Sequence, residues 1–141
     1  MKRALRLDKA RLAALSAVLR LYLHPDQLRE RLPALSLLTR RQDDIAETAA
    51  RILPAVTAAF PAHAVAIAPC RSQIGSGALP VDLLPSMAVT LAGGGLQSAA
   101  ASVRRRPVPV LGRVGDRRLW LDCRCLEPAE ESRFAANLVS A

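Results

Sequence analysis

The chain has 141 residues, of which 51% are hydrophobic and 23% charged, and its formal net charge is +8. This composition excludes a disordered chain and fits one domain of ordinary size. The positive charge favours polyanionic partners, although a genome-wide preference for arginine explains it equally well.

The three cysteines bear on the redox environment of the protein and on whether it has a metal site. Cys70, Cys123 and Cys125 show no disulfide-like spacing, so we expect a reducing, cytoplasmic environment. Cys123 and Cys125 have strand spacing and should share a buried face. They lack two further ligands, so no metal site is predicted. Arginines interrupt the longest apolar stretches, and no membrane span is expected.

The N-terminal part of the sequence predicts helices. Residues 8–23 form an amphipathic pattern with Asp8 as the N-cap, and a second short helix follows from Pro25 to about residue 32. The apolar stripe of the first helix consists of Leu12, Leu15, Val18, Leu19, Tyr22 and Leu23.

A long helix is predicted next. Thr39 and Gln42 fit a capping box at its start. Pro54 should kink or split this helix, and Pro61 should end it. Its buried face is predicted to contain Ile45, Ala49, Ile52, Leu53, Val56 and Phe60.

The C-terminal part changes to a mixed pattern. The predicted elements are strands at 63–69 and 87–91, a glycine-bearing loop at 72–80, a helix at 96–106, a hairpin with strands 108–114 and 118–126, and a final helix from 127. The last helix should bury Phe134, Leu138 and Val139. This order predicts an α+β fold, an antiparallel sheet with helices on one face, preceded by long helices. We divide the chain into a helical linker, 1–62, and an α+β small domain, 63–141.

Few residues suggest chemistry by themselves. Arg3 and Arg6 would share a face if helical and could converge on one oxyanion, although a solvated basic start is the alternative. The 72–80 loop could offer backbone N–H groups to an anion, or could simply join two strands. A basic cluster could contact a nucleic-acid backbone or form a solvated surface: Arg104, Arg105, Arg106, Arg113, Arg117 and Arg118. No nucleophile has a partnered histidine, so no self-contained active site is predicted.

Three segments, taken in order, resemble the bacterial L-seryl-tRNA(Sec) selenium transferase family, also called selenocysteine synthase. The first is the Arg-x-x-Arg-x-Asp-Lys segment at 3–9, with the leucine-rich stretch through 22. The second runs from Ile45 through the loop at 72–80. The third is the proline pair and Leu-Gly-Arg strand at 107–114, with a return strand ending in Asp122-x-Arg124.

The resemblance implies the C-terminal small domain of a fold-type I enzyme that uses pyridoxal 5'-phosphate (PLP). Such enzymes convert seryl-tRNA(Sec) to selenocysteyl-tRNA(Sec) with selenophosphate, and the full-length protein is expected to be a homo-oligomer. Arg3 and Arg6 match the arginines implied to bind selenophosphate. A possible active-site loop would contain Ser72, Gly75 and Gly77.

The resemblance also implies what this chain lacks. A PLP enzyme needs a Schiff-base lysine, and Lys2 and Lys9, the only lysines, do not match that position. We therefore expect no catalytic residue here, no covalently bound cofactor and no activity from this portion alone. Three alternatives stay open: a related PLP-dependent lyase of the same superfamily, a non-enzymatic basic tRNA-binding module, and a dimerisation domain that pairs through the Leu12–Tyr22 stripe.

Overall fold

The computed structural model describes residues 8–73 and 83–139. It divides the chain into two compact units, Met1–Thr39 (unit 1) and Arg40–Ala141 (unit 2), and each is described by itself. The long helix that precedes residue 62 packs on the sheet of unit 2.

Unit 1 contains three helices, α1 (Lys9–Leu21), α2 (Pro25–Arg31) and α3 (Pro33–Leu38). Asp8 is the N-cap of α1, as predicted, and its carboxylate accepts a hydrogen bond of 2.9 Å from the backbone N–H of Arg11. Helix α2 is confirmed, whereas α3 was not predicted. Each of the two short helices begins with a proline, which suits the first turn because no intrahelical bond needs its missing N–H.

Helix α4 (Gln42–Ala59) opens unit 2, and the capping box predicted for it is wrong. The hydroxyl of Thr39 donates to the Leu35 carbonyl at 2.8 Å. The side-chain amide of Gln42 donates to the Ser86 carbonyl at 3.2 Å. The N-cap position is Arg41, and no side chain caps it.

Helix α4 also passes through Pro54 without being split. Pro54 is exposed, while the opposite face of the helix is buried against the rest of unit 2. Burial of that face keeps one helix on both sides of the proline, because tertiary packing outweighs local propensity. The buried residues of α4 are Ile45, Thr48, Ala49, Ile52 and Val56.

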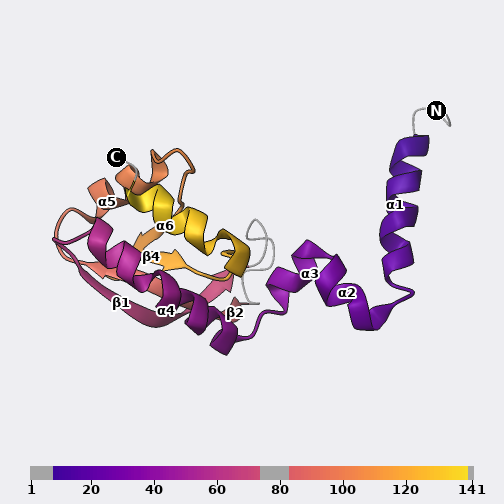
Figure 1. Cartoon of the computed structure of the whole chain (residues 1–141), viewed down its shortest axis with the longest axis horizontal. Helices are drawn as coiled ribbons and strands as arrows, with labels where there is room; N and C mark the ends of the chain where they lie inside the picture. The colour runs from indigo at the N-terminus through magenta and orange to yellow at the C-terminus, as the bar shows by residue number, and fades with distance from the viewer. Residues whose placement is uncertain (1–7, 74–82, 140–141) are drawn as a thin grey trace. The chain divides into compact units, whose positions relative to one another are not determined.

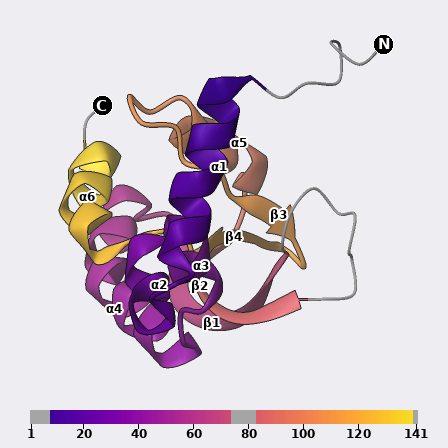
Figure 2. The same cartoon turned by 90° about the vertical axis from the view of Figure 1, so that its right-hand side faces the viewer.

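The sheet of unit 2 has four antiparallel strands in the order β1-β2-β4-β3, which confirms the predicted α+β fold. Strands β1 (Ala64–Gln73) and β2 (Leu83–Ala92) are longer than predicted. Strands β3 (Arg113–Gly115) and β4 (Arg118–Asp122) are shorter. Figures 1 and 2 show the sheet with α4 and α6 side by side.

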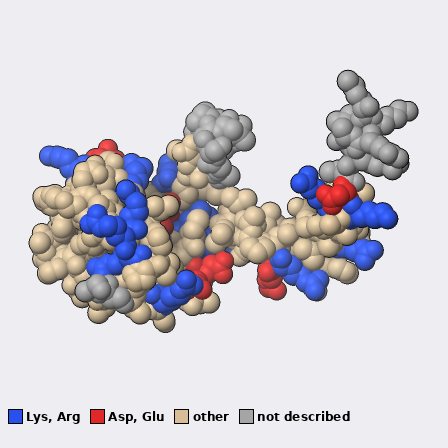
Figure 3. All heavy atoms as spheres, turned by 90° about the horizontal axis from the view of Figure 1, so that it is seen from above, with Lys and Arg blue, Asp and Glu red and all other residues tan. Residues whose placement is uncertain are grey.

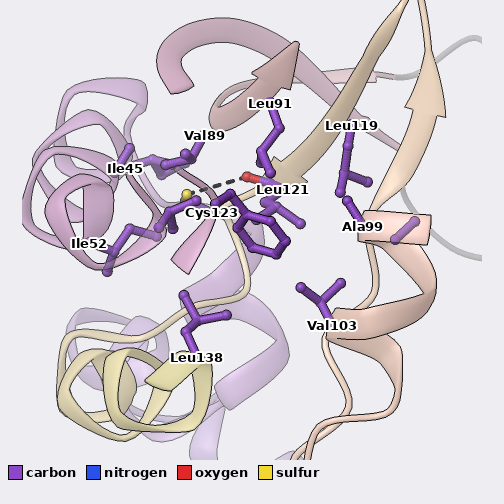
Figure 4. Packing of buried hydrophobic residues seen from close by; sticks show 14 residues of the cluster. Ile45, Ile52, Val89, Leu91, Ala99, Val103, Leu119, Leu121, Cys123 and Leu138 are labelled. Carbon is purple, nitrogen blue, oxygen red and sulfur yellow. Dashed lines mark hydrogen bonds between the residues drawn. The ribbon is translucent and has the colours of Figure 1, made fainter. Parts of the chain in front are cut away.

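The helices pack on one face of the sheet, as predicted. Besides α4, this layer contains α5 (Leu96–Arg104) and α6 (Glu131–Val139), the latter preceded by a 3-10 turn at Pro128–Glu130. Figure 4 shows the core between helices and sheet, which includes Ile45, Ile52, Val89, Leu91, Ala99, Val103, Leu119, Leu121 and Leu138. Alternation along the strands places the sheet members of this set on the same face.

Two predicted burials near the C-terminus are wrong. Cys123 is buried, but Cys125 is exposed, because β4 ends at Asp122 and the strand alternation ends with it. In α6, Leu138 is buried and Phe134 half-buried, whereas Val139 is 74% exposed. Neighbouring positions on a helix point about 100° apart, so both cannot face the core fully.

Candidate functional site

One face of the sheet is not covered by helices, and we call it the helix-free face. Polar side chains from different strands lie together on it. Strand register places Ser72, Ser86, Trp120 and Asp122 on this face, opposite the leucines of the core. Of the predicted site residues, only Ser72 lies within the described residues. Arg3, Arg6, Gly75 and Gly77 lie outside them.

Ser72 belongs to strand β1 rather than to a loop, which corrects the sequence prediction. The strand extends to Gln73 because β2 pairs with it residue by residue up to Leu83. The Ser72 side chain is buried and turned toward Asp122. It is thus part of the sheet's own hydrogen bonding.

The Asp122 carboxylate is held by three donors. The hydroxyls of Ser72 and Ser86 donate to its two oxygens at 2.5 and 2.6 Å. The backbone N–H of Arg124 donates at 3.0 Å, which bends the chain into an Asx turn and ends β4. The carboxylate therefore has one fixed orientation.

The Arg124 side chain is buried, with 5% exposure, although arginine is rarely buried without partners. Its Nε donates to the Ser72 hydroxyl at 3.2 Å, and its two terminal nitrogens donate to the carbonyls of Arg40 and Pro85. The guanidinium thus joins β1, the edge of β2 and the start of α4. Burying it is tolerable because hydrogen bonds replace its hydration.

Arg40 also binds the segment that contains Arg124. One of its terminal nitrogens donates to three backbone carbonyls of the segment that follows β4. They are those of Cys123, Arg124 and Leu126, at 3.2, 2.7 and 2.7 Å. The other donates to the Thr48 hydroxyl at 2.9 Å. Arg40 therefore fixes the segment between β4 and α6.

A cavity of about 670 Å³ lies beside this network. Its lining combines two arginines, Arg71 and Arg113, with the carboxylates of Asp116 and Asp122 and the indole of Trp120. The Arg113 guanidinium lies 5.5 Å from the centre of the Trp120 ring, and the Trp120 Nε1 donates to the Gly115 carbonyl at 3.0 Å. The cavity wall is therefore built from ordered side chains of both charges.

Cys70 and Cys123 are not activated nucleophiles. Burial raises the pKa of the Cys123 thiol to about 11, and burial also raises the pKa of Cys70. His63 is occupied by a 2.9 Å hydrogen bond with the Gly94 carbonyl and by an edge contact with Phe60. Within residues 8–73 and 83–139, no three metal-ligating side chains gather at one place.

The basic cluster predicted from sequence is divided in the structure. Arg113 and Arg118 lie on the helix-free face by register, and Arg118 contacts the Thr90 hydroxyl at 3.4 Å. Arg104 instead ends α5, on the helix-covered side. Figure 3 shows Lys and Arg side chains at several separate places on unit 2. None of the helices in the described ranges is long and apolar enough to cross a membrane.

Sequence reasoning missed Ser86 and Arg40 as members of this network. Ser86 lies mid-strand, and nothing in its neighbours indicates a carboxylate partner from β4. For Arg40 the three carbonyl partners lie more than eighty residues away. Only the Asp122-x-Arg124 motif points to this network locally. An aspartate side chain often accepts a hydrogen bond from the backbone N–H two residues later, which forms an Asx turn.

Together, fold and site define a small α+β domain that presents an ordered polar wall, without a nucleophile–base pair among its described residues. Comparison with known proteins identifies the family. The family described as L-seryl-tRNA selenium transferase matches residues 1–127, and the chain belongs to it.

Curated relatives agree. The chain is 54% identical over 144 residues to the L-seryl-tRNA(Sec) selenium transferase of Klebsiella pneumoniae strain 342, and 54% identical over 145 residues to that of Escherichia fergusonii. Each match covers 99% of this chain but only 31% of the relative. The chain thus spans about a third of the length of these relatives and corresponds to their C-terminal portion.

Proposed function

We propose that this chain is the C-terminal part of a PLP-dependent selenium transferase that converts seryl-tRNA(Sec) to selenocysteyl-tRNA(Sec) with selenophosphate. The observation that carries the proposal is 54% identity along 99% of the chain to proteins of that name. For the whole protein we further propose the PLP fold-type I architecture, a homo-oligomer and a cytoplasmic location.

The residues of this chain do not fit a covalently held PLP. Lys9 is the one lysine among the described residues, and it is an exposed residue at the start of α1. It lines none of the described cavities. A Schiff-base lysine needs a pocket that holds the cofactor and lowers the amine pKa. The chain is therefore proposed to be inactive without the remainder of the family polypeptide.

What this portion contributes is proposed to be substrate contact and support. Arg3 and Arg6 match the family's paired arginines and would bind the anionic selenophosphate as bidentate donors. The network around Asp122 and Arg124 would keep the helix-free face of unit 2 rigid. Preorganised walls of this kind reduce the ordering cost when a substrate binds.

A chimera tests the proposal. The C-terminal 31% of the Escherichia fergusonii relative is replaced by this chain, and selenium incorporation into seryl-tRNA(Sec) is measured with selenophosphate. We expect activity from the chimera and none from this chain alone. Replacing Arg3 and Arg6 by alanine should raise the KM for selenophosphate, whereas Arg11→Ala, which alters an exposed ion pair with Asp8, should not. An inactive but folded chimera would contradict the proposal.

Direct tRNA binding by this chain is the second candidate, and one observation favours it. Arg104, Arg105 and Arg117 are exposed and form no ion pair within the described ranges. Such side chains can neutralise phosphates and make binding strongly salt-dependent. Salt-dependent binding of tRNA(Sec) by the chain alone would support this function, and binding that is indifferent to salt would exclude it.

A further inference from the structure

The first helix of unit 1 and the turn that follows it expose an apolar stripe. Leu12, Leu15, Leu19 and Leu23, which we call the leucine stripe, are 49%, 50%, 56% and 73% exposed. With Ser16 and Arg20 they line a shallow groove of about 350 Å³. None of the described residues of α1, α2 or α3 is buried. Unit 1 thus has no core of its own in the part of the chain that the structure describes.

A helix of this kind needs a partner to be stable. Helix α1 has 13 residues, a length at which an isolated helix is marginal in water. Most helical stability in proteins comes from burying an apolar face, and here that face lies in solvent. A row of large exposed leucines is also unusual on a surface that meets only water.

We infer that the leucine stripe docks on the portion of the family polypeptide that this chain does not contain, in an apolar groove with an acidic margin. The family match begins at residue 1, so unit 1 belongs to the family's fold. About two thirds of the length of each matched relative lies outside the part that this chain covers. The inference rests on family membership and not on the proposed reaction.

Charge and length favour this occupant over a second copy of the chain. Residues 1–39 contain eight basic and three acidic side chains, so two copies of unit 1 would repel each other. The stripe also extends over less than two full heptads, and a stable coiled coil requires three or four. An acidic margin on the partner would instead pair with cations such as Arg20, which lines the groove.

Hydrogen exchange of the α1 amides tests the inference. It is measured by mass spectrometry on this chain alone and on the chimera with the Escherichia fergusonii relative, without tRNA, PLP or selenophosphate. In the chain alone α1 should exchange nearly as an unfolded peptide. In the chimera exchange should slow by about a hundredfold or more, because opening then requires separation of the interface.

Two matched double variants of the chimera identify the face involved. Leu15→Asp with Leu19→Asp should abolish the protection of α1. Ala13→Asp with Ala17→Asp, which places the same charges on the side away from the stripe, should retain most of it. Protection of the β2 amides, measured in the same experiment, shows whether unit 2 remains folded in each variant.

Two results would overturn the inference. One is rapid α1 exchange in a chimera whose β2 amides are protected. The other is protection that already appears in the chain alone and grows with concentration, since a second copy would then be the occupant. A chimera that protects α1 but transfers no selenium would instead count only against the proposed function.

Discussion

Arg40 and Arg124 bind each other's backbone. A terminal nitrogen of Arg40 donates to the Arg124 carbonyl at 2.7 Å, and a terminal nitrogen of Arg124 donates to the Arg40 carbonyl at 3.3 Å. The two residues are 84 positions apart in the sequence. This reciprocal pair joins the start of α4 to the end of β4, the two segments on which the ordered wall of the helix-free face depends.

Removing the Arg124 side chain should therefore destabilise unit 2. Arg124→Met leaves the Pro85 carbonyl and the Asp122 network without their buried donor, and we expect a loss of about 2–4 kcal/mol in the free energy of unfolding. Urea denaturation followed by circular dichroism measures it. Arg133→Met, which removes an exposed arginine bound to Glu130, should change stability by less than about 0.5 kcal/mol. Equal losses in the two variants would show that the buried network contributes little.

Gly112 is the second position where a small change should have a large effect. A Cβ at this position would lie 2.7 Å from Leu119 Cδ1, 2.8 Å from Leu121 Cδ2 and 3.0 Å from the Trp120 carbonyl oxygen. Because the two leucines are buried in the core, Gly112→Ala should cost about 1–3 kcal/mol. Gly94→Ala meets no atom within 4 Å and is the matched control. Equal melting temperatures of the two variants in thermal denaturation would contradict the close packing around Gly112.

Glu131 should make stability depend on acid pH. The Arg51 guanidinium donates to both oxygens of this carboxylate, at 2.8 and 2.9 Å, and lowers its pKa below the ordinary value of 4.5. A lowered folded-state pKa stabilises the fold above pH 4.5, and this contribution disappears as pH falls through the folded-state pKa. Glu131→Gln should thus unfold at a lower urea midpoint than the native chain at pH 7, with the difference vanishing at the acid end. A difference independent of pH would exclude the ion pair as its cause.

The thiols of Cys125 and Cys123 should be alkylated at very different rates. Cys125 is exposed and should be alkylated first at pH 8. Cys123 is buried with a pKa of about 11, so almost none of it is thiolate at that pH, and it should react only on unfolding. Time-resolved mass mapping of iodoacetamide adducts distinguishes the sites, and Cys125→Ser should remove the fast phase. Early labelling of Cys123 would contradict its burial.

Incubation with PLP tests the missing cofactor site. Borohydride reduction of the mixture should trap no stoichiometric lysine adduct, because Lys9 is exposed at the end of a helix with no surrounding pocket. Lys9→Arg controls for sporadic modification of that amine. A stoichiometric adduct at either lysine would mean that this portion holds the cofactor after all.

Local features were predictable from the sequence, and long-range partners were not. The N-cap at Asp8 and the start of α2 at Pro25 depend on neighbouring residues, and both predictions are confirmed. The capping box failed because Gln42 bonds to Ser86, a partner 44 residues away that no local pattern reveals. Local spacing favoured the box, and the tertiary contact overrode it.

The candidate site shows the same division. The sequence predicts Ser72 in a loop, whereas its place in a strand depends on pairing with β2. The burial of Cys125 was predicted from alternation that continues past Asp122, whereas the Asx turn at Asp122 ends the strand. Arg3 and Arg6 lie outside the described residues, and their role stays a prediction.

The two units also differ in their aromatic residues. The single tyrosine, Tyr22, is the C-cap of α1 in unit 1. The single tryptophan, Trp120, lies in β4 of unit 2. Each unit therefore contains one intrinsic fluorophore of its own type. Trp120 emission follows the unfolding of the sheet, and quenching of Tyr22, which is 54% exposed, follows the covering of the first helix. The natural sequence thus permits the assembly of each unit to be observed separately, with no added dye.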